Sequence, residues 1–299
     1  MIKRLKALLG SERVLENESL KEYTTFRVGG PSKALILVNN REELSKVIGL
    51  LKESGSTFFV IGNGSNLLVG DKGYDGYVVK LSGDFLEIQT EGERIRAGAG
   101  AMLVKVCKEA ESKALSGLEF AYGIPGTVGG AMVMNAGAYG GEMKDCVESV
   151  DVLREDGSIV TLSKEEMAFG YRDSLLKHKD YICLETCFYL KYDDKKLITE
   201  RMNECMGKRR DKQPLEHPSA GSTFKRPEGA FAGKLIEEAG LRGFRVGGAC
   251  VSEKHCGFVV NDKGGSAKDI CDVMEEVSRR VKENSGFTLE PEVIKIGNF

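Results

Sequence analysis

Two loops rich in glycine and in small hydrogen-bonding side chains carry the first chemical signal in this sequence. Residues 62–66 read Gly-Asn-Gly-Ser-Asn directly after an apolar run, and residues 117–141 contain eight glycines. Clustered main-chain N–H groups with serine and asparagine donors suit the binding of an anion such as a phosphate. An ordinary tight turn would use the same residue types. Two such loops in one chain, however, favour a large phosphorylated cofactor.

Neither of the two standard phosphate-binding loops is present. The segment from Gly229 to Lys234 is one residue too short for a P-loop, and Leu235 stands where a serine or threonine would meet magnesium. After Gly98 and Gly100, Leu103 occupies the place of the third glycine of a dinucleotide fingerprint. The sequence therefore supports neither a P-loop nor a Rossmann domain.

Charge and composition exclude several classes of protein. The 299 residues carry 43 basic and 45 acidic side chains, for a net charge of −2, so no nucleic-acid partner is expected. No apolar stretch is long enough to predict a membrane span, and the first residues lack the apolar core of a signal peptide, so we expect a cytoplasmic protein. The eight cysteines form no C-x-x-C pair and the three histidines are scattered, which predicts buried reduced thiols and no metal.

A mixed framework of helices and strands must position the two loops. A capping-box-like pattern from Asn40 to Glu43 predicts the start of a helix that ends at Gly55. Residues 57–61 predict a buried strand running into the first loop, residues 77–81 and 94–98 predict further strands, and residues 102–110 predict a helix. Residues 117–141 hold too many glycines for a helix or a central strand, so we expect an extended, loop-rich segment there.

The second half of the chain is also predicted to contain both strands and helices. Strands are predicted at residues 147–153, 158–162 and 181–190, and the polar residues 191–196 indicate a domain boundary. Beyond it we expect a helix of about 15 residues ending near Arg210, then helices at residues 232–239 and 266–284. The tail at residues 287–296 alternates like a strand, which would place Glu290 and Glu292 on one face with Ile294 and Ile296.

Several motifs occur together in one order along the chain. They are Thr24-Thr25-Phe26-Arg27-Val28-Gly29-Gly30, the two glycine loops, Gly170-Tyr171-Arg172-Asp173-Ser174, Ser219-Ala220-Gly221-Ser222-Thr223-Phe224-Lys225 and Leu289-Glu290-Pro291-Glu292-Val293. In this set and order the chain resembles the UDP-N-acetylenolpyruvoylglucosamine reductases. The resemblance implies an α+β protein with the FAD-binding fold of the vanillyl-alcohol oxidase type. Its parts would be FAD subdomain one (residues 1–79, joined by the C-terminal strand 288–299), FAD subdomain two (80–194) and a substrate domain (195–287).

The resemblance also implies which residues hold the cofactor. FAD would be bound without a covalent link, because neither loop contains the histidine to which some relatives in the wider fold attach flavin. The implied contacts are Gly62, Asn63, Gly64, Ser65, Asn66, Gly123, Pro125, Gly126, Thr127, Gly129, Gly130, Asn135, Ala136 and Gly137.

Three residues match the reactive positions of that family. Arg172 would bind the substrate carboxylate and the developing enolate, Ser222 would donate a proton, and Glu292 would supply an acidic group, either charged or protonated. Without the resemblance, Arg172 could equally form a surface ion pair with Asp173, and Ser222 could be an ordinary loop serine. Glu290 is the competing acid on the tail, and the substrate contacts would be Lys212, Lys225 and Arg226.

The implied activity is NADPH-dependent reduction, through FAD, of UDP-N-acetylglucosamine enolpyruvate to UDP-N-acetylmuramate in peptidoglycan synthesis, by a monomer. Because no tyrosine follows Tyr192, the chain resembles the shorter class, which lacks a tyrosine loop over the substrate. Two alternatives remain: a flavin-dependent oxidase of the same fold acting on another alcohol or sugar, and a nucleotide-binding protein without catalytic activity. The first would use oxygen without NADPH, and the second would be colourless.

Overall fold

A computed structural model describes all residues from Met1 to Phe299, and the chain divides into two compact units. The first unit contains residues 1–16, 34–63 and 76–208, and the second contains residues 17–33, 64–75 and 209–299. Each unit is therefore assembled from segments far apart in the sequence. The predicted three-part division of the chain remains a prediction.

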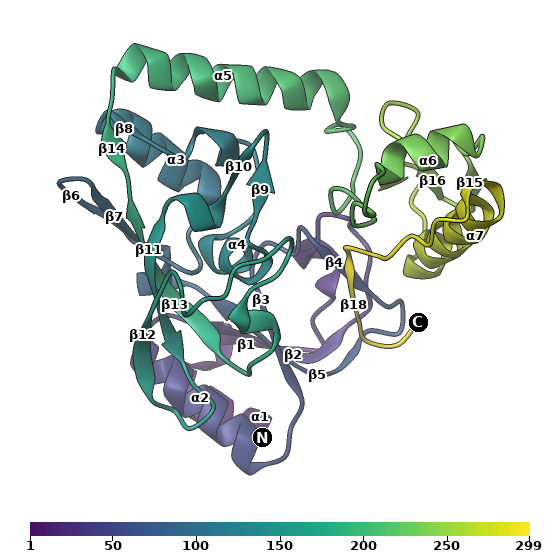
Figure 1. The fold of residues 1–299 in the computed structure, drawn as a ribbon. Helices are drawn as coiled ribbons and strands as arrows, with labels where there is room; N and C mark the ends of the chain where they lie inside the picture. Colours follow the sequence, from purple (N-terminus) through teal and green to yellow (C-terminus); the bar gives the residue numbers. More distant parts are fainter. The chain divides into compact units, whose positions relative to one another are not determined.

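A mixed four-stranded sheet lies largely within the first unit. Its order is β1 (Val14–Glu16), β2 (Ser32–Val38), β5 (Tyr74–Leu81) and β3 (Phe58–Ile61), with β3 and β5 parallel. Helices α1 (Ile2–Leu9) and α2 (Arg41–Glu53) belong to the same unit (Figure 1). The prediction for α2 is confirmed: Asn40 accepts the Glu43 N–H at 2.9 Å, and the helix buries Leu44, Val47, Ile48 and Leu51.

An antiparallel five-stranded sheet is the other main layer of the first unit. Its order is β12 (Ile159–Ser163), β11 (Val147–Leu153), β13 (Ile182–Tyr189), β7 (Arg94–Gly98) and β6 (Ile88–Glu91). Helix α3 (Leu103–Ser112), predicted at residues 102–110, buries Leu103, Val106, Cys107 and Ala110. Two short pairs complete the unit, β8 (Leu115–Ser116) with β14 (Lys191–Tyr192) and β9 (Gly137–Ala138) with β10 (Gly141–Glu142).

The prediction that residues 117–141 contain no helix is wrong, because α4 spans Val128–Met134. Thr127 caps its start, and the next two main-chain N–H groups donate to the Ala101 and Ala99 carbonyls at 2.8 Å each. A Cβ on Gly129 would lie only 3.0 Å from the Ala99 Cβ. Glycine in this helix therefore permits a close approach to the neighbouring chain, a tertiary contact that outweighs its low helix propensity.

The second unit combines a small sheet with two helices and a parallel strand pair. The sheet runs β15 (Arg245–Val246), β16 (Ala249–Val251) and β17 (Val259–Asn261), and the helices are α6 (Ala232–Glu238) and α7 (Ala267–Ser285). Ser266 and Asp269 form a capping box at the start of α7, and Gly286 ends it at a φ of 78°. The helix, predicted at residues 266–284, buries Ile270, Val273, Met274, Val277 and Val281.

The predicted tail strand is shorter than expected. Only β18 (Ile294–Ile296) is a strand, and it pairs in parallel with β4 (Leu67–Val69). Before it, Pro291 forms a single bridge with Phe224. The alternation at residues 287–293 reflects the burial of Leu289 and Val293 rather than a continuous ladder.

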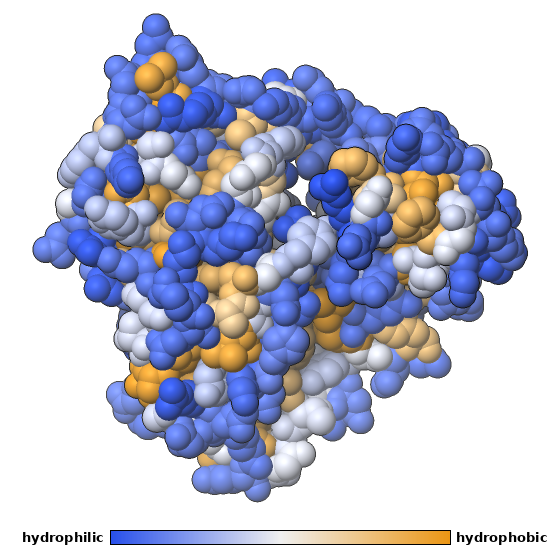
Figure 2. Space-filling model, viewed as in Figure 1, coloured by the Kyte–Doolittle hydropathy of each residue, from blue (hydrophilic) through white to orange (hydrophobic).

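Helix α5 spans Lys195–Lys212, somewhat longer than predicted. All eight cysteine side chains are buried, as expected of core thiols. No helix is long and apolar enough to cross a membrane. On the face seen in Figure 2, hydrophilic residues cover most of the surface and apolar ones form small, scattered groups.

Candidate functional site

The two glycine loops meet inside the first unit. The Asn63 side-chain amide donates to the Pro125 carbonyl at 2.6 Å. A Cβ on Gly62 would overlap the hydroxyl of Thr127, so this close approach requires glycine. The first two residues after strand β3 therefore contact the second loop directly. Sequence reasoning predicted both loops, but not that they touch each other.

Asn135 ties the second loop to the turn that carries Arg172. It is fully buried in the left-handed conformation that ends α4, with a φ of 40°. Its amide donates to the Glu142 carboxylate and to the Gly170 carbonyl at 2.9 Å, and its Oδ1 accepts the Lys144 N–H at 3.0 Å. Because both N–H groups of the side chain are used inside the protein, Asn135 could bind a flavin only through its main chain or as an acceptor through Oδ1.

Arg172 occupies a tight turn with an unusual backbone conformation. The main chains of Gly170 and Asp173 are hydrogen-bonded to each other, and Arg172 between them has a φ of 53°. A long side chain at positive φ is uncommon and is found where the surrounding structure enforces it. The guanidinium donates to the Gly137 carbonyl at 3.2 Å and lies 5.2 Å from the centre of the exposed Tyr171 ring.

Asp173 is engaged with other partners than the neighbouring arginine. His178 Nε2 lies 2.9 Å from its carboxylate and Lys177 Nζ lies 3.8 Å away. The hydrogen bond with His178 lowers the pKa of the Asp173 carboxyl, while burial opposes the shift. The alternative in which Arg172 merely pairs with Asp173 is therefore not the arrangement found.

In the second unit, residues 64–66 form the rest of the first loop. Gly64 is buried with a φ of 61°, and a Cβ there would overlap the Tyr23 carbonyl oxygen. Asn66 donates its side-chain amide to the Glu292 carbonyl at 3.1 Å, and its own carbonyl accepts the Ile294 N–H at 3.0 Å. This part of the loop is thus bound to the C-terminal segment that carries the predicted acid.

Ser222 and Glu292 lie on segments that are hydrogen-bonded to each other. Around the bridge between Phe224 and Pro291, the Glu292 N–H donates to the Thr223 carbonyl at 2.9 Å and the Lys225 N–H donates to the Glu290 carbonyl at 2.8 Å. Ser222 is exposed, whereas Glu292 is half-buried. The structure therefore brings two of the three predicted reactive residues into one short paired region of the second unit, and Arg172 belongs to the first unit.

The competing acid has a different environment. Glu290 is exposed and its carboxylate accepts a hydrogen bond from Lys225 Nζ at 3.1 Å. A carboxylate already paired on the surface is less suited to act on a substrate than a half-buried one. The environment of Glu290 thus argues against it as the reactive acid, and the same hydrogen bond gives Lys225, a predicted substrate contact, a partner inside the protein.

The other predicted substrate contacts are cationic and exposed. Lys212 is the last residue of α5, and Arg226 lies 4.0 Å from the centre of the Phe231 ring. Stacking engages the face of a guanidinium rather than the in-plane N–H groups through which arginine recognises phosphate. Phe231 is 58% exposed, and neither its exposure nor this stack was predicted from the sequence.

The donor sets of both loops fit a phosphate. In the first unit, the main-chain N–H groups of Gly126 and Thr127 have no hydrogen-bond partner within the protein, and Gly130 is exposed. In the second unit, the same holds for the amide and the hydroxyl of Ser65. Grouped amide and hydroxyl donors of this kind bind the oxygens of a diphosphate. Gly123, with a φ of 90°, and Ala136 belong to the same loop of the first unit as Gly126 and Thr127.

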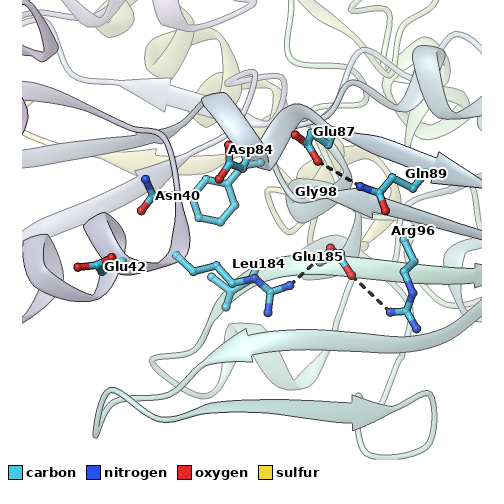
Figure 3. A pocket seen from close by; sticks show the side chains of 11 residues that line it. Asn40, Glu42, Asp84, Glu87, Gln89, Arg96, Gly98, Leu184 and Glu185 are labelled. Carbon is cyan, nitrogen blue, oxygen red and sulfur yellow. Dashed lines mark hydrogen bonds and ion pairs between the residues drawn. The ribbon is translucent and has the colours of Figure 1, made fainter.

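A hollow of about 390 Å³ in the first unit contains none of the predicted site residues. It lies beside β6, β7 and β13, where Figure 3 shows Glu185 facing Arg96. The Glu185 carboxylate lies 3.4 Å from the Arg96 guanidinium and 3.5 Å from that of Arg41. Three of its charged side chains, Arg41, Arg96 and Glu185, are thus paired with one another. Mixed, mutually paired charges do not indicate a particular ligand.

Comparisons with known proteins agree with the motifs. Residues 32–163 match the FAD binding domain model, and residues 213–296 match the model of the UDP-N-acetylenolpyruvoylglucosamine reductase C-terminal domain. The first match covers β2 to β12 with both glycine loops, and the second covers Ser222 and Glu292.

Similarity to individual proteins extends over nearly the whole chain. The UDP-N-acetylenolpyruvoylglucosamine reductase of Lachnoclostridium phytofermentans is 46% identical, over 99% of this chain and 97% of its own. The reductase of Clostridium botulinum is 49% identical, over 94% of this chain and 92% of its own. The crystal structure of the corresponding reductase from Thermus caldophilus superimposes with a TM-score of 0.83 at 41% identity, covering 95% of this chain and 99% of the other.

Proposed function

The chain belongs to the UDP-N-acetylenolpyruvoylglucosamine reductase family, whose fold binds FAD, and from this premise we propose that it reduces UDP-N-acetylglucosamine enolpyruvate to UDP-N-acetylmuramate with NADPH as reductant. The reaction would serve peptidoglycan synthesis. Support comes above all from one observation: the segments that bear Ser222 and Glu292 are hydrogen-bonded to each other and lie within the matched C-terminal domain.

FAD, when bound, supplies hydride transfer from NADPH to the methylene carbon of the enolpyruvyl group. The two glycine loops would hold its diphosphate through the Gly126, Thr127 and Ser65 donors. No histidine occurs in either loop, so we propose that the cofactor is bound without a covalent link.

The protein's own residues would stabilise charge and move a proton. Arg172 is permanently cationic, and its guanidinium would bind the substrate carboxylate and the negative charge that develops as the enolate forms. Ser222 would donate its hydroxyl proton to the carbon next to the one that receives hydride, and would recover a proton from solvent. Glu292 would supply the acidic group beside the enolate.

Replacing Ser222 tests this assignment. In Ser222→Ala, NADPH should still bleach the flavin at the wild-type rate, because that half-reaction needs no proton from serine. Formation of UDP-N-acetylmuramate should fall by at least about a hundredfold, since general acid catalysis contributes about 10² to 10⁴. Stopped-flow absorbance measures the first half-reaction, and chromatography of the nucleotide sugars measures the second.

Ser219→Ala is the matched control, because it removes a half-buried serine hydroxyl from the same segment. Both half-reactions should remain close to wild type in that variant. Normal product formation by Ser222→Ala would refute the proton-donor role.

A further inference from the structure

The main chain of Glu292 is held from two sides within the second unit. Its N–H donates to the Thr223 carbonyl at 2.9 Å, and its carbonyl accepts the Asn66 side-chain amide at 3.1 Å. The Asn66 carbonyl also accepts the Ile294 N–H at 3.0 Å, at the start of β18. Three hydrogen bonds therefore fix the short stretch from Glu292 to Ile294. This stretch needs them, because it does not belong to a continuous β-ladder that would hold it in place.

Thr223 is in turn anchored by every polar group it has. It is fully buried, its N–H donates to the Gly257 carbonyl at 2.9 Å, and its hydroxyl accepts the Val259 N–H at 2.8 Å. Together with its carbonyl bond to Glu292, these contacts join three separate segments of the unit. Ser222 directly precedes this residue, so the place of Ser222 follows from that of Thr223.

We propose that Thr223 and Asn66 are positioning residues that set the place of Glu292 relative to Ser222. The inference rests on the proposed roles of Ser222 and Glu292 in the reduction. Neither positioning residue needs to touch the reacting atoms. Proton delivery requires a geometry within a fraction of an ångström, and a displacement of about 1 Å can slow a reaction by about a hundredfold.

Thr223→Val tests the proposal with little change in size. It removes the hydroxyl that accepts the Val259 N–H and leaves that buried donor without a partner. Reduction of the flavin by NADPH should keep its rate. Reoxidation by the enolpyruvyl substrate should slow by between about tenfold and a hundredfold, and its solvent deuterium isotope effect should increase, because proton delivery becomes the slow step.

Two variants serve as matched controls. Thr223→Ser keeps the accepting hydroxyl and should restore the oxidative half-reaction to within about threefold of wild type, since only a methyl group is lost. Thr288→Val makes the same chemical change at an exposed position of the same unit and should alter neither half-reaction.

Asn66→Asp provides a second, independent variant should Thr223→Val not fold. The carboxylate has the shape of the amide but faces the Glu292 carbonyl with an acceptor, so that hydrogen bond is lost. Both rates are read from the flavin absorbance and so report only enzyme that contains cofactor. Because Asn66 is also one of the predicted FAD contacts, the expected result is an oxidative half-reaction that slows by a larger factor than the reductive one.

Two results would overturn the inference. One is an unchanged oxidative half-reaction and isotope effect in both Thr223→Val and Asn66→Asp. The other is an equal loss in both half-reactions, which indicates general disruption rather than positioning. Ser222→Ala is measured in parallel: if it is inactive while the positioning variants are normal, the proposed function stands and this inference falls. If Ser222→Ala itself turns over normally, the proposed proton donor has failed.

Discussion

Asn135 offers a quantitative test of how the arginine turn is held. Replacing it with alanine removes the hydrogen bonds to the Gly170 carbonyl and the Lys144 N–H, each worth about 1 kcal/mol. The third bond, to Glu142, counts for less, because that side chain is half-buried and also pairs with Lys144 at 2.6 Å. Alanine at a φ of 40° adds about 1 kcal/mol of strain.

Asn135→Ala should therefore lower the free energy of unfolding by about 3 kcal/mol, a large share of the 5–15 kcal/mol that folded domains typically have. Urea denaturation followed by circular dichroism measures it. Asn203→Ala, on the exposed side of α5, is the control and should change stability by less than about 0.5 kcal/mol. A loss below about 1 kcal/mol in Asn135→Ala would refute the reasoning, because it would mean that these buried bonds are replaced or contribute nothing.

Three further changes test other parts of the structure. Burial holds the pKa of His255 below its usual value of 6.5, so the unfolded chain binds the proton more readily than the folded one. The stabilising contribution of the neutral imidazole should therefore be complete above about pH 6.5 and fall as the pH drops below it. Denaturant unfolding at pH 7.5 and about pH 5.5 should show that His255→Gln loses less unfolding free energy between the two pH values than wild type does. Asn40→Ala should cost about 1 kcal/mol of unfolding free energy, because the Glu43 N–H loses its cap; no change would show that α2 does not depend on this cap. Val277→Ala, at a fully buried position of α7, should cost about 2–3 kcal/mol through lost burial and a residual cavity, and a cost below about 1 kcal/mol would mean that the core collapses around the deletion.

Elements with strong periodicity were predictable from the sequence. Helix α7 combines a capping box, a buried stripe and a terminal glycine, and each of these acts locally. Strand β11 was predicted at its observed bounds for the same reason. The motif around Ser222 and Glu292 also identified the residues that the second unit brings onto paired segments.

Tertiary contacts account for what the sequence could not predict. Helix α4 forms in spite of two glycines because its first N–H groups find carbonyls at Ala99 and Ala101, residues far away in the chain. Glycine there permits a close contact within the protein, so not every glycine of the two loops has to face a cofactor. The hydrogen bonds of Thr223 and Asn66 to Glu292 likewise join segments that no local pattern connects.

The identity of the oxidant for the reduced flavin distinguishes the proposed reductase from a flavin-dependent oxidase of the same fold. The purified protein would be reduced anaerobically with one equivalent of NADPH and then mixed with UDP-N-acetylglucosamine enolpyruvate while the visible spectrum is followed. For the proposed reductase we expect rapid return of the oxidised flavin spectrum with stoichiometric formation of UDP-N-acetylmuramate. A flavin that stays reduced with this substrate and is reoxidised only when oxygen is admitted would contradict it.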